Sequence, residues 1–219
     1  WDKLIDLDKV HHINNGVDLV AFNNYKEQYQ LDDPDLNDPN IFKVIYCGSI
    51  RKVNQVGKLL DVANLLKNEK VKFLIYGSGD ELDTLIERVT NEQINNVRLN
   101  GFVDKKYIPY ITTKSDVNII LGETSKLFSY GISMNKLFDY FASGKPTILS
   151  FKTNYSIVKE YQAGIELDDS NPELIVKAIL DFMKMKDSEY QIYCQNALKA
   201  AKDYDYQSLT KQLLNIINN

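Results

Sequence analysis

The chain has 219 residues, a formal net charge of −4, 44% hydrophobic residues and 26% charged residues. These values are typical of one large globular domain and exclude a disordered or fibrous chain. The acidic balance, with no long basic run, argues against nucleic acid as a partner, because duplex binding uses many lysine and arginine contacts to phosphate. No apolar stretch approaches the length that spans a bilayer, so we expect no transmembrane segment in this part.

The predicted elements alternate between strands and helices. The stretch 32–40 is expected to be a loop, because it is acidic, contains prolines and is weakly apolar. Short apolar runs then predict strands at 42–47, 71–76, 97–99, 117–121, 147–151 and 165–167. Helical patterns lie at 56–66, 81–90, 105–112, 136–142, 156–161, 173–185, 189–202 and 206–217. This alternation predicts an α/β fold with an open, Rossmann-like parallel sheet of about six strands and helices on both faces.

Glycines follow the first two predicted strands, where open parallel sheets bind ligands. After the first strand, a glycine and two basic side chains would suit a pyrophosphate, although a plain turn with solvated side chains explains the pattern equally well. The G-x-G after the second strand lacks the third glycine of the dinucleotide fingerprint, so NAD is not expected. The candidate residues of these two turns are Gly48, Ser49, Arg51, Lys52, Gly77 and Gly79.

The segment 130–146, YGISMNKLFDYFASGKP, places a lysine and a carboxylate at the start of a predicted helix. Asn135 is expected to cap this helix. The first-turn amides and Lys136 would favour an anion, and Asp139 could accept hydrogen bonds from the two hydroxyls of a ribose. An amphipathic surface helix is the alternative for the same pattern. Helical spacing puts the following residues on the side that faces away from the core: Lys136, Asp139, Tyr140 and Ser143.

Segments along nearly the whole chain resemble the C-terminal, donor-binding domain of the family-4 (group 1) retaining glycosyltransferases of the GT-B fold. INNGVD (13–18) is similar to the segment that opens that domain, and DYFASGKPTIL (139–149) is similar to its E-A-x-A-x-G-x-P-V segment. The other similar segments are VIYCGSI (44–50), KFLIYGSGDELDTL (72–85), VRLNGFV (97–103), residues 116–121 and AGIEL (163–167).

The resemblance implies that the whole enzyme transfers a sugar from a nucleotide-diphosphate sugar to an acceptor hydroxyl with retention, in the synthesis of surface polysaccharide or glycoconjugate. No metal or other cofactor is implied. Residues 1–219 would form a single donor-binding domain, in which residues 1–40 are an interdomain lead-in and a loop. The N-terminal acceptor domain would be absent, and the chain would bind nucleotide without turnover. The protein would be cytoplasmic, and peripheral to the inner membrane only through the missing half.

The resemblance also assigns roles to individual residues. Arg51 and Lys136 would stabilise the leaving diphosphate, and Asp139 would hold the ribose. The turn Gly101-Phe102-Val103 would contact the base, although a buried aromatic residue is the alternative for Phe102. The remaining donor-binding residues are expected in the loop before the helix, and they are Gly131, Ser133, Met134 and Asn135.

Two departures from the family pattern affect these roles. Ser49 stands where the family has a basic residue, which is why Arg51 and Lys136 are expected to neutralise the diphosphate. Gly131 stands at the first of two family glutamates, and Asp139 stands at the second. The sequence therefore leaves open a non-catalytic nucleotide-sugar binding module or a sugar-nucleotide epimerase as alternatives.

Overall fold

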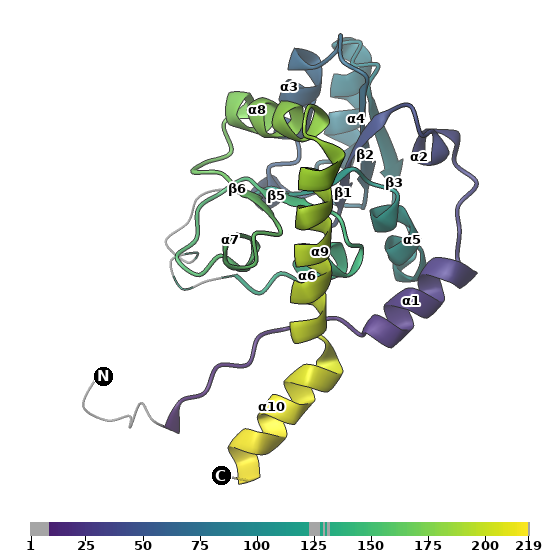
Figure 1. Ribbon diagram of the computed structural model, residues 1–219. Coiled ribbons are helices and arrows are strands. Elements are labelled where there is room, and N and C mark those ends of the chain that lie inside the picture. Colours follow the sequence, from purple (N-terminus) through teal and green to yellow (C-terminus); the bar gives the residue numbers. More distant parts are fainter. Residues whose placement is uncertain (1–8, 123–127, 129, 131, 219) are drawn as a thin grey trace.

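The computed structural model describes residues 9–122, 128, 130 and 132–218 (Figure 1). In this part of the chain one parallel sheet has the strand order β3-β2-β1-β4-β5-β6. Its strands are β1 (Phe42–Cys47), β2 (Val71–Tyr76), β3 (Val97–Gly101), β4 (Val117–Ile120), β5 (Thr147–Leu149) and β6 (Gly164–Glu166). The order of connection reverses between β1 and β4, the place where open α/β sheets bind their ligands. The predicted α/β fold with a Rossmann-like parallel sheet is confirmed.

Helices cover both faces of this sheet, because every central strand is apolar on both sides. In β1, Ile45 and Cys47 belong to one core cluster, whereas Val44 and Tyr46 belong to the other. The first cluster is completed by α1 (Leu19–Gln28), α5 (Ile108–Thr113), α6 (Asn135–Ala142), α7 (Ile157–Glu160) and α9 (Asp187–Asp203). The second cluster is completed by α3 (Lys58–Leu65), α4 (Leu82–Asn91) and α8 (Pro172–Met183).

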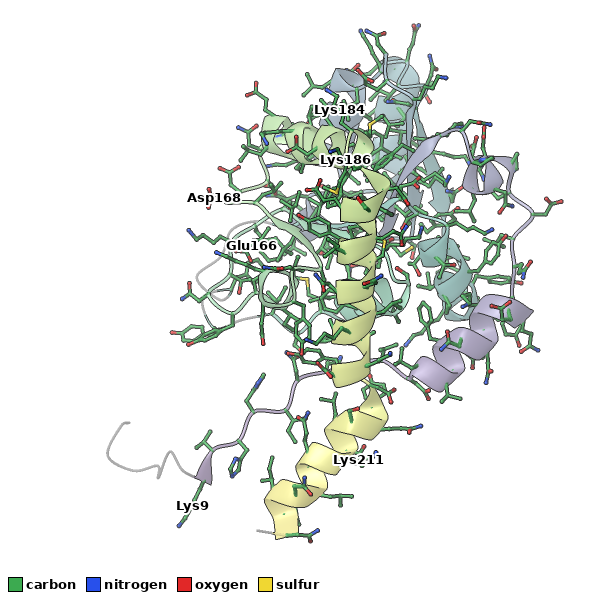
Figure 2. The ribbon with its side chains drawn as sticks, viewed as in Figure 1. Lys9, Glu166, Asp168, Lys184, Lys186 and Lys211 are labelled. Carbon is green, nitrogen blue, oxygen red and sulfur yellow. The ribbon has the colours of Figure 1, made fainter. Side chains whose placement is uncertain are left out.

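The C-terminal helix α10 (Tyr206–Asn218) leaves the end of α9 and projects away from the body (Figure 1). Figure 2 shows Lys184 and Lys186 at the bend between α8 and α9, and Lys211 on α10. The start of α10 is tied to the N-terminal part of the chain, since Tyr206 N donates to Val17 O at 2.9 Å. None of the helices in the described residues has both the length and the apolar character that crossing a bilayer requires.

The prediction of a loop at residues 32–40 is wrong where the short helix α2 (Pro34–Asn37) forms. Helix α1, earlier in the chain, was not among the predicted helices. Asp18 caps α1 by accepting from Ala21 N at 2.8 Å. The Asp33 side chain accepts from the first amides of α2, whose first residue is a proline, so an acidic stretch that reads as a loop begins a helix. Helix α1 could not be recognised from the sequence pattern, because the segment is polar and buries only one side chain, Phe22.

Candidate functional site

The site is built around the start of α6, which begins at Asn135. The residue before it, Met134, is in the N-cap position and makes no side-chain capping bond, so the prediction of Asn135 as the cap is wrong. The Asn135 side-chain oxygen instead accepts from the Asn15 amide, and Asn15 N donates to Ser133 Oγ at 3.3 Å. The N-terminal segment therefore crosses the start of α6 and leaves its first amides without a side-chain cap.

Lys136 extends from the first turn of α6 to the turn that follows β1. Its Nζ atom donates to the hydroxyl of Tyr46 at 3.2 Å and lies 4.6 Å from the centre of that ring. A Cβ atom added to Gly48 would lie 2.7 Å from the same nitrogen, so the glycine leaves space for the ammonium. Burial lowers the pKa of Lys136 to about 8, because an ammonium loses hydration here. A bound anion would relieve that cost.

Asp139 lies one turn further along α6 and is half-buried. Burial raises the pKa of this carboxyl group to about 6, and the positive charge of Lys105 acts in the opposite direction. The carboxylate is therefore incompletely hydrated, and hydroxyl donors from a ligand would stabilise its charged form.

These groups share one hollow at the carboxyl end of β1, with a volume of about 550 Å³. This is within the size range of small-molecule sites. A neighbouring hollow of about 290 Å³ extends towards α1 and shares Lys105, Ile108, Asn135 and Asp139 with the first. We call the larger one the α6 hollow, and its lining residues are Cys47, Gly48, Lys105, Ile108, Asn135, Lys136, Asp139 and Tyr140. The combination of lysines, a carboxylate and helix N-terminal amides can hold an anion that is linked to a diol.

Tyr140 and Ser143 are buried, so the prediction that they face away from the core is wrong. The Tyr140 hydroxyl accepts from Cys47 N at 2.9 Å, and burial strongly raises the pKa of that hydroxyl. The Ser143 hydroxyl donates to Tyr140 O at 2.6 Å and accepts from the Asn118 amide at 3.1 Å. The hydroxyl groups of Tyr140 and Ser143 thus both have partners inside the protein, which lowers the cost of burying them.

The glycines after β2 allow two turns to approach each other closely. Gly77 has a φ of +150°, and a Cβ atom there would lie 1.8 Å from Gly48 O. A Cβ atom on Gly79 would lie 2.0 Å from Ile50 O, and Ile50 N donates to Ser78 O at 2.8 Å. The described lining of the α6 hollow includes Gly48 but neither Gly77 nor Gly79. These two glycines are required by backbone contact between the turns.

The basic turn after β1 is open to solvent. Ser49, Arg51 and Lys52 are exposed, and Arg51 immediately precedes the short 3₁₀ helix η2 (Lys52–Asn54). The Asn54 amide donates to both oxygens of Ser49 at 2.8 Å and braces the turn. The described lining of the α6 hollow contains Gly48 from this turn but not its basic side chains.

The remaining predicted residues lie at different depths. Phe102 is 78% exposed, so the alternative of a buried aromatic residue is wrong. Gly101 has a φ of +69° with open space around it, while Val103 packs against the first core cluster. In the loop before α6, Ser133 is exposed and Met134 packs against the same cluster. The predicted residue Gly131 lies outside the described residues.

The sequence analysis did not identify Lys105 as a candidate site residue. In the 3₁₀ helix η3 (Lys105–Tyr107), Lys106 lies over the rings of Tyr29 and Tyr107, at 5.1 and 5.4 Å from their centres. Lys105 instead lines the α6 hollow beside Asp139. The position of Lys105 shortly after β3 could have indicated this, because the carboxyl ends of parallel strands lie along one edge of the sheet.

Comparisons with known proteins agree with this fold. No match was found among curated proteins. The structure is similar to HepE of Anabaena, solved in complex with UDP and glucose, with 16% identity, a TM-score of 0.72 and coverage of 94% of this chain and 56% of that one. It is also similar to sucrose-phosphate synthase of Thermosynechococcus elongatus, with 16% identity, a TM-score of 0.73 and coverage of 94% and 51%.

A third similar structure is Staphylococcus aureus TarM, solved with fondaparinux, α-GlcNAc-glycerol and UDP, with 18% identity, a TM-score of 0.65 and coverage of 84% and 37%. This chain thus spans about half, or less, of the length of these proteins. The family model for glycosyl transferases group 1 matches residues 5–203. The chain therefore belongs to the group 1 glycosyl transferases, and its fold is that of a GT-B glycosyltransferase domain.

Proposed function

We propose that the α6 hollow binds a nucleotide-diphosphate sugar and that this chain is the donor-binding domain of a larger glycosyltransferase. The observation that carries the proposal is the meeting of Lys136, Asp139 and Gly48 in one hollow, where the order of strand connection reverses. The whole enzyme would then transfer the sugar to an acceptor hydroxyl with retention. Its acceptor half would lie outside the 219 residues, which on their own would bind donor without turnover.

The cations would act on the diphosphate. During transfer, the bond between the anomeric carbon and the diphosphate oxygen breaks, a bond to the acceptor oxygen forms, and the proton of the acceptor hydroxyl passes to an oxygen of the leaving diphosphate. The negative charge that develops on the leaving diphosphate would be stabilised by Lys136 and by the amides of Ser133 to Asn135. Arg51 would reach the same phosphates from the exposed turn after β1, with Ser49 and Lys52 beside it. This arrangement needs neither a metal ion nor a cofactor.

The nucleoside would extend from the diphosphate along the carboxyl edge of the sheet. The Asp139 carboxylate would accept hydrogen bonds from both ribose hydroxyls. The turn Gly101-Phe102-Val103 would meet the base, with Lys105 next to it. Gly48 would line the pocket, and Gly77 and Gly79 would shape it through the contact between the two turns. Because HepE and TarM were solved with UDP, uridine donors are the first candidates for this chain.

The proposal places the whole enzyme in the cytoplasm, in the synthesis of surface polysaccharide or glycoconjugate. Membership of the group 1 glycosyl transferases and the proposed nucleotide-sugar donor support this setting. The acceptor half, rather than this chain, would make any contact with the inner membrane.

Calorimetric titration of the chain with UDP, GDP, ADP and their glucose conjugates tests the donor site. We expect one nucleoside diphosphate to bind and Asp139→Ala to weaken that binding by about tenfold or more, the range for charge-assisted hydrogen bonds. No binding of any of these ligands, or unchanged affinity in a folded Asp139→Ala variant, would contradict the proposal. Transfer of a radiolabelled sugar by the whole enzyme would then separate catalysis from a binding module.

A further inference from the structure

A separate hollow lies beside the start of α6, between the N-terminal segment and α7, with a volume of about 480 Å³. We call it the tyrosine hollow. Three tyrosines line it together with side chains that can donate and accept hydrogen bonds. The residues that matter for the argument are Tyr130, Tyr155, Tyr204, Asn14, Ser133 and Glu160.

Its rings differ in how firmly they are held. Tyr204 is partly buried, with its ring centre 5.3 Å from that of Phe138 and 6.1 Å from that of Tyr161. Tyr130 and Tyr155 are 84% and 71% exposed. Exposed aromatic side chains that gather around one hollow are typical of a binding site rather than of a plain surface.

The chemistry of this hollow differs from that of the α6 hollow. Its described lining contains no lysine or arginine, and Glu160 adds a negative charge, so it does not suit a phosphate. Aromatic faces can pack against the C–H groups of a sugar ring, while Asn14, Ser133 and Glu160 can exchange hydrogen bonds with its hydroxyls. A neutral saccharide fits both properties.

The two hollows meet at the start of α6. Ser133 lines the tyrosine hollow, and Asn135, two residues later, lines the α6 hollow. Between them passes the N-terminal segment, held by the bonds from Asn15 to Ser133 and Asn135. A saccharide in the tyrosine hollow would therefore lie next to the proposed diphosphate site.

We propose that the tyrosine hollow binds the acceptor saccharide of the transfer reaction, so that this chain holds part of the acceptor as well as the donor. The acceptor role rests on the proposed function, whereas saccharide binding itself rests on the lining of the hollow. Tyr155 would supply an aromatic face for the sugar ring in the hollow that Tyr204 also lines.

The test is a titration of the chain, saturated with UDP, against maltotriose, xylotriose and tri-N-acetylchitotriose, followed by NMR. We expect at least one trisaccharide to bind at millimolar concentration. Tyr155→Ala should weaken the affinity for that trisaccharide by about fivefold, in line with the loss of one aromatic contact. Tyr155→Phe keeps the ring and should bind within about twofold of the wild type. The matched control is Ile192→Ala, which removes a 56% exposed side chain from a different hollow and should leave trisaccharide binding unchanged. That hollow is also lined by Glu166 and Asp168, which Figure 2 labels.

Three results would overturn the proposal. The first is that no trisaccharide binds up to about 20 mM, equivalent to a negligible affinity. The second is that binding persists unchanged in Tyr155→Ala, and the third is that a trisaccharide bound to the UDP-free chain is displaced by added UDP, which would put it in the donor site. The UDP affinity of Tyr155→Ala, measured separately, should equal that of the wild type. If UDP fails to bind while trisaccharide binding still depends on Tyr155, the proposed donor function and the acceptor role are both wrong, and the hollow is a saccharide site of another kind.

Discussion

The start of α6 and the turn after β1 both present basic residues to the carboxyl edge of the sheet, but they hold them differently. Lys136 is half-buried and bound to the Tyr46 hydroxyl, whereas Arg51 and Lys52 are exposed. An exposed side chain must lose about 0.5–1.5 kcal/mol of conformational freedom when a ligand immobilises it. Lys136 has lost part of that freedom before any ligand arrives. The contribution of a cation to binding thus depends on its preorganisation as well as on its charge.

Replacement of Lys136 should have the largest effect. Lys136→Ala removes a cation that is already held beside Gly48. We expect UDP affinity to fall by about 100-fold, within the range for hydrogen bonds to charged groups. Uridine, which lacks the phosphates, should lose less than about threefold. Calorimetry with both ligands measures the difference. Equal losses for UDP and uridine would show that Lys136 does not meet the phosphates.

Replacement of Asp139 should have the second-largest effect on affinity, and the effect should be the same for UDP and uridine. Asp139→Asn keeps the shape of the side chain but removes its charge, so we expect UDP and uridine to weaken alike, by about 10- to 30-fold. A 2′-deoxy ligand should lose little further affinity in this variant. A loss confined to UDP would place Asp139 near the phosphates and not at the ribose.

The pH dependence of donor binding should report the ionisation of both Lys136 and Asp139 in the α6 hollow. With a pKa of about 8 for Lys136 and about 6 for Asp139, both are charged only between these values in the free chain. Affinity for UDP-glucose should therefore be greatest from pH 6 to 8 and fall about tenfold by pH 9, where binding must return a proton to Lys136. It should also fall below pH 6, where binding must remove the proton from Asp139.

Single variants identify the source of each limb of that profile. Lys136→Met should abolish the alkaline loss, and Asp139→Asn should abolish the acidic one. UDP-glucose is the suitable ligand because its diphosphate is esterified at both ends. An alkaline limb that survives in Lys136→Met would assign the titration to another group.

The exposed turn should show the smallest effect. Arg51 must be ordered when the ligand binds, and its guanidinium fork offsets only part of that entropic cost. Arg51→Ala should therefore weaken UDP binding by only about fivefold. Lys52→Ala, its neighbour and control, should change affinity by less than about twofold. If the losses are reversed, the phosphates contact the next residue along the turn. If Arg51→Ala matches Lys136→Ala, preorganisation does not separate the two regions.

The sheet could be predicted from the sequence because its strands are short runs of consecutive apolar residues between turn residues. The runs at Phe42–Cys47 and Val71–Tyr76 match the observed strands from end to end. Helix α1 could not be predicted from periodicity, because it buries only Phe22. Its visible signal was Asp18, a capping residue placed directly before it.

The site was harder to predict than the fold, because its lining depends on which strands become neighbours. Lys105 and Asp139 are 34 positions apart in the sequence and reach the same hollow only through the order of the sheet. Tyr140 was predicted to face away from the core because a tyrosine was counted as polar in the helical pattern. In the structure it is buried, and its hydroxyl accepts a hydrogen bond from the backbone of β1. Local pattern cannot supply either fact.

The contact between the turns after β1 and β2 has a consequence for mutational scans of this protein. Any side chain at Gly77 or Gly79 would collide with the backbone at Gly48 or Ile50, so a scan should record both positions as intolerant. Such a result would reflect failure to fold, although both glycines lie in turns where binding residues are expected. Protein yield must be scored alongside ligand affinity before an intolerant glycine in these turns is counted as a contact to the nucleotide.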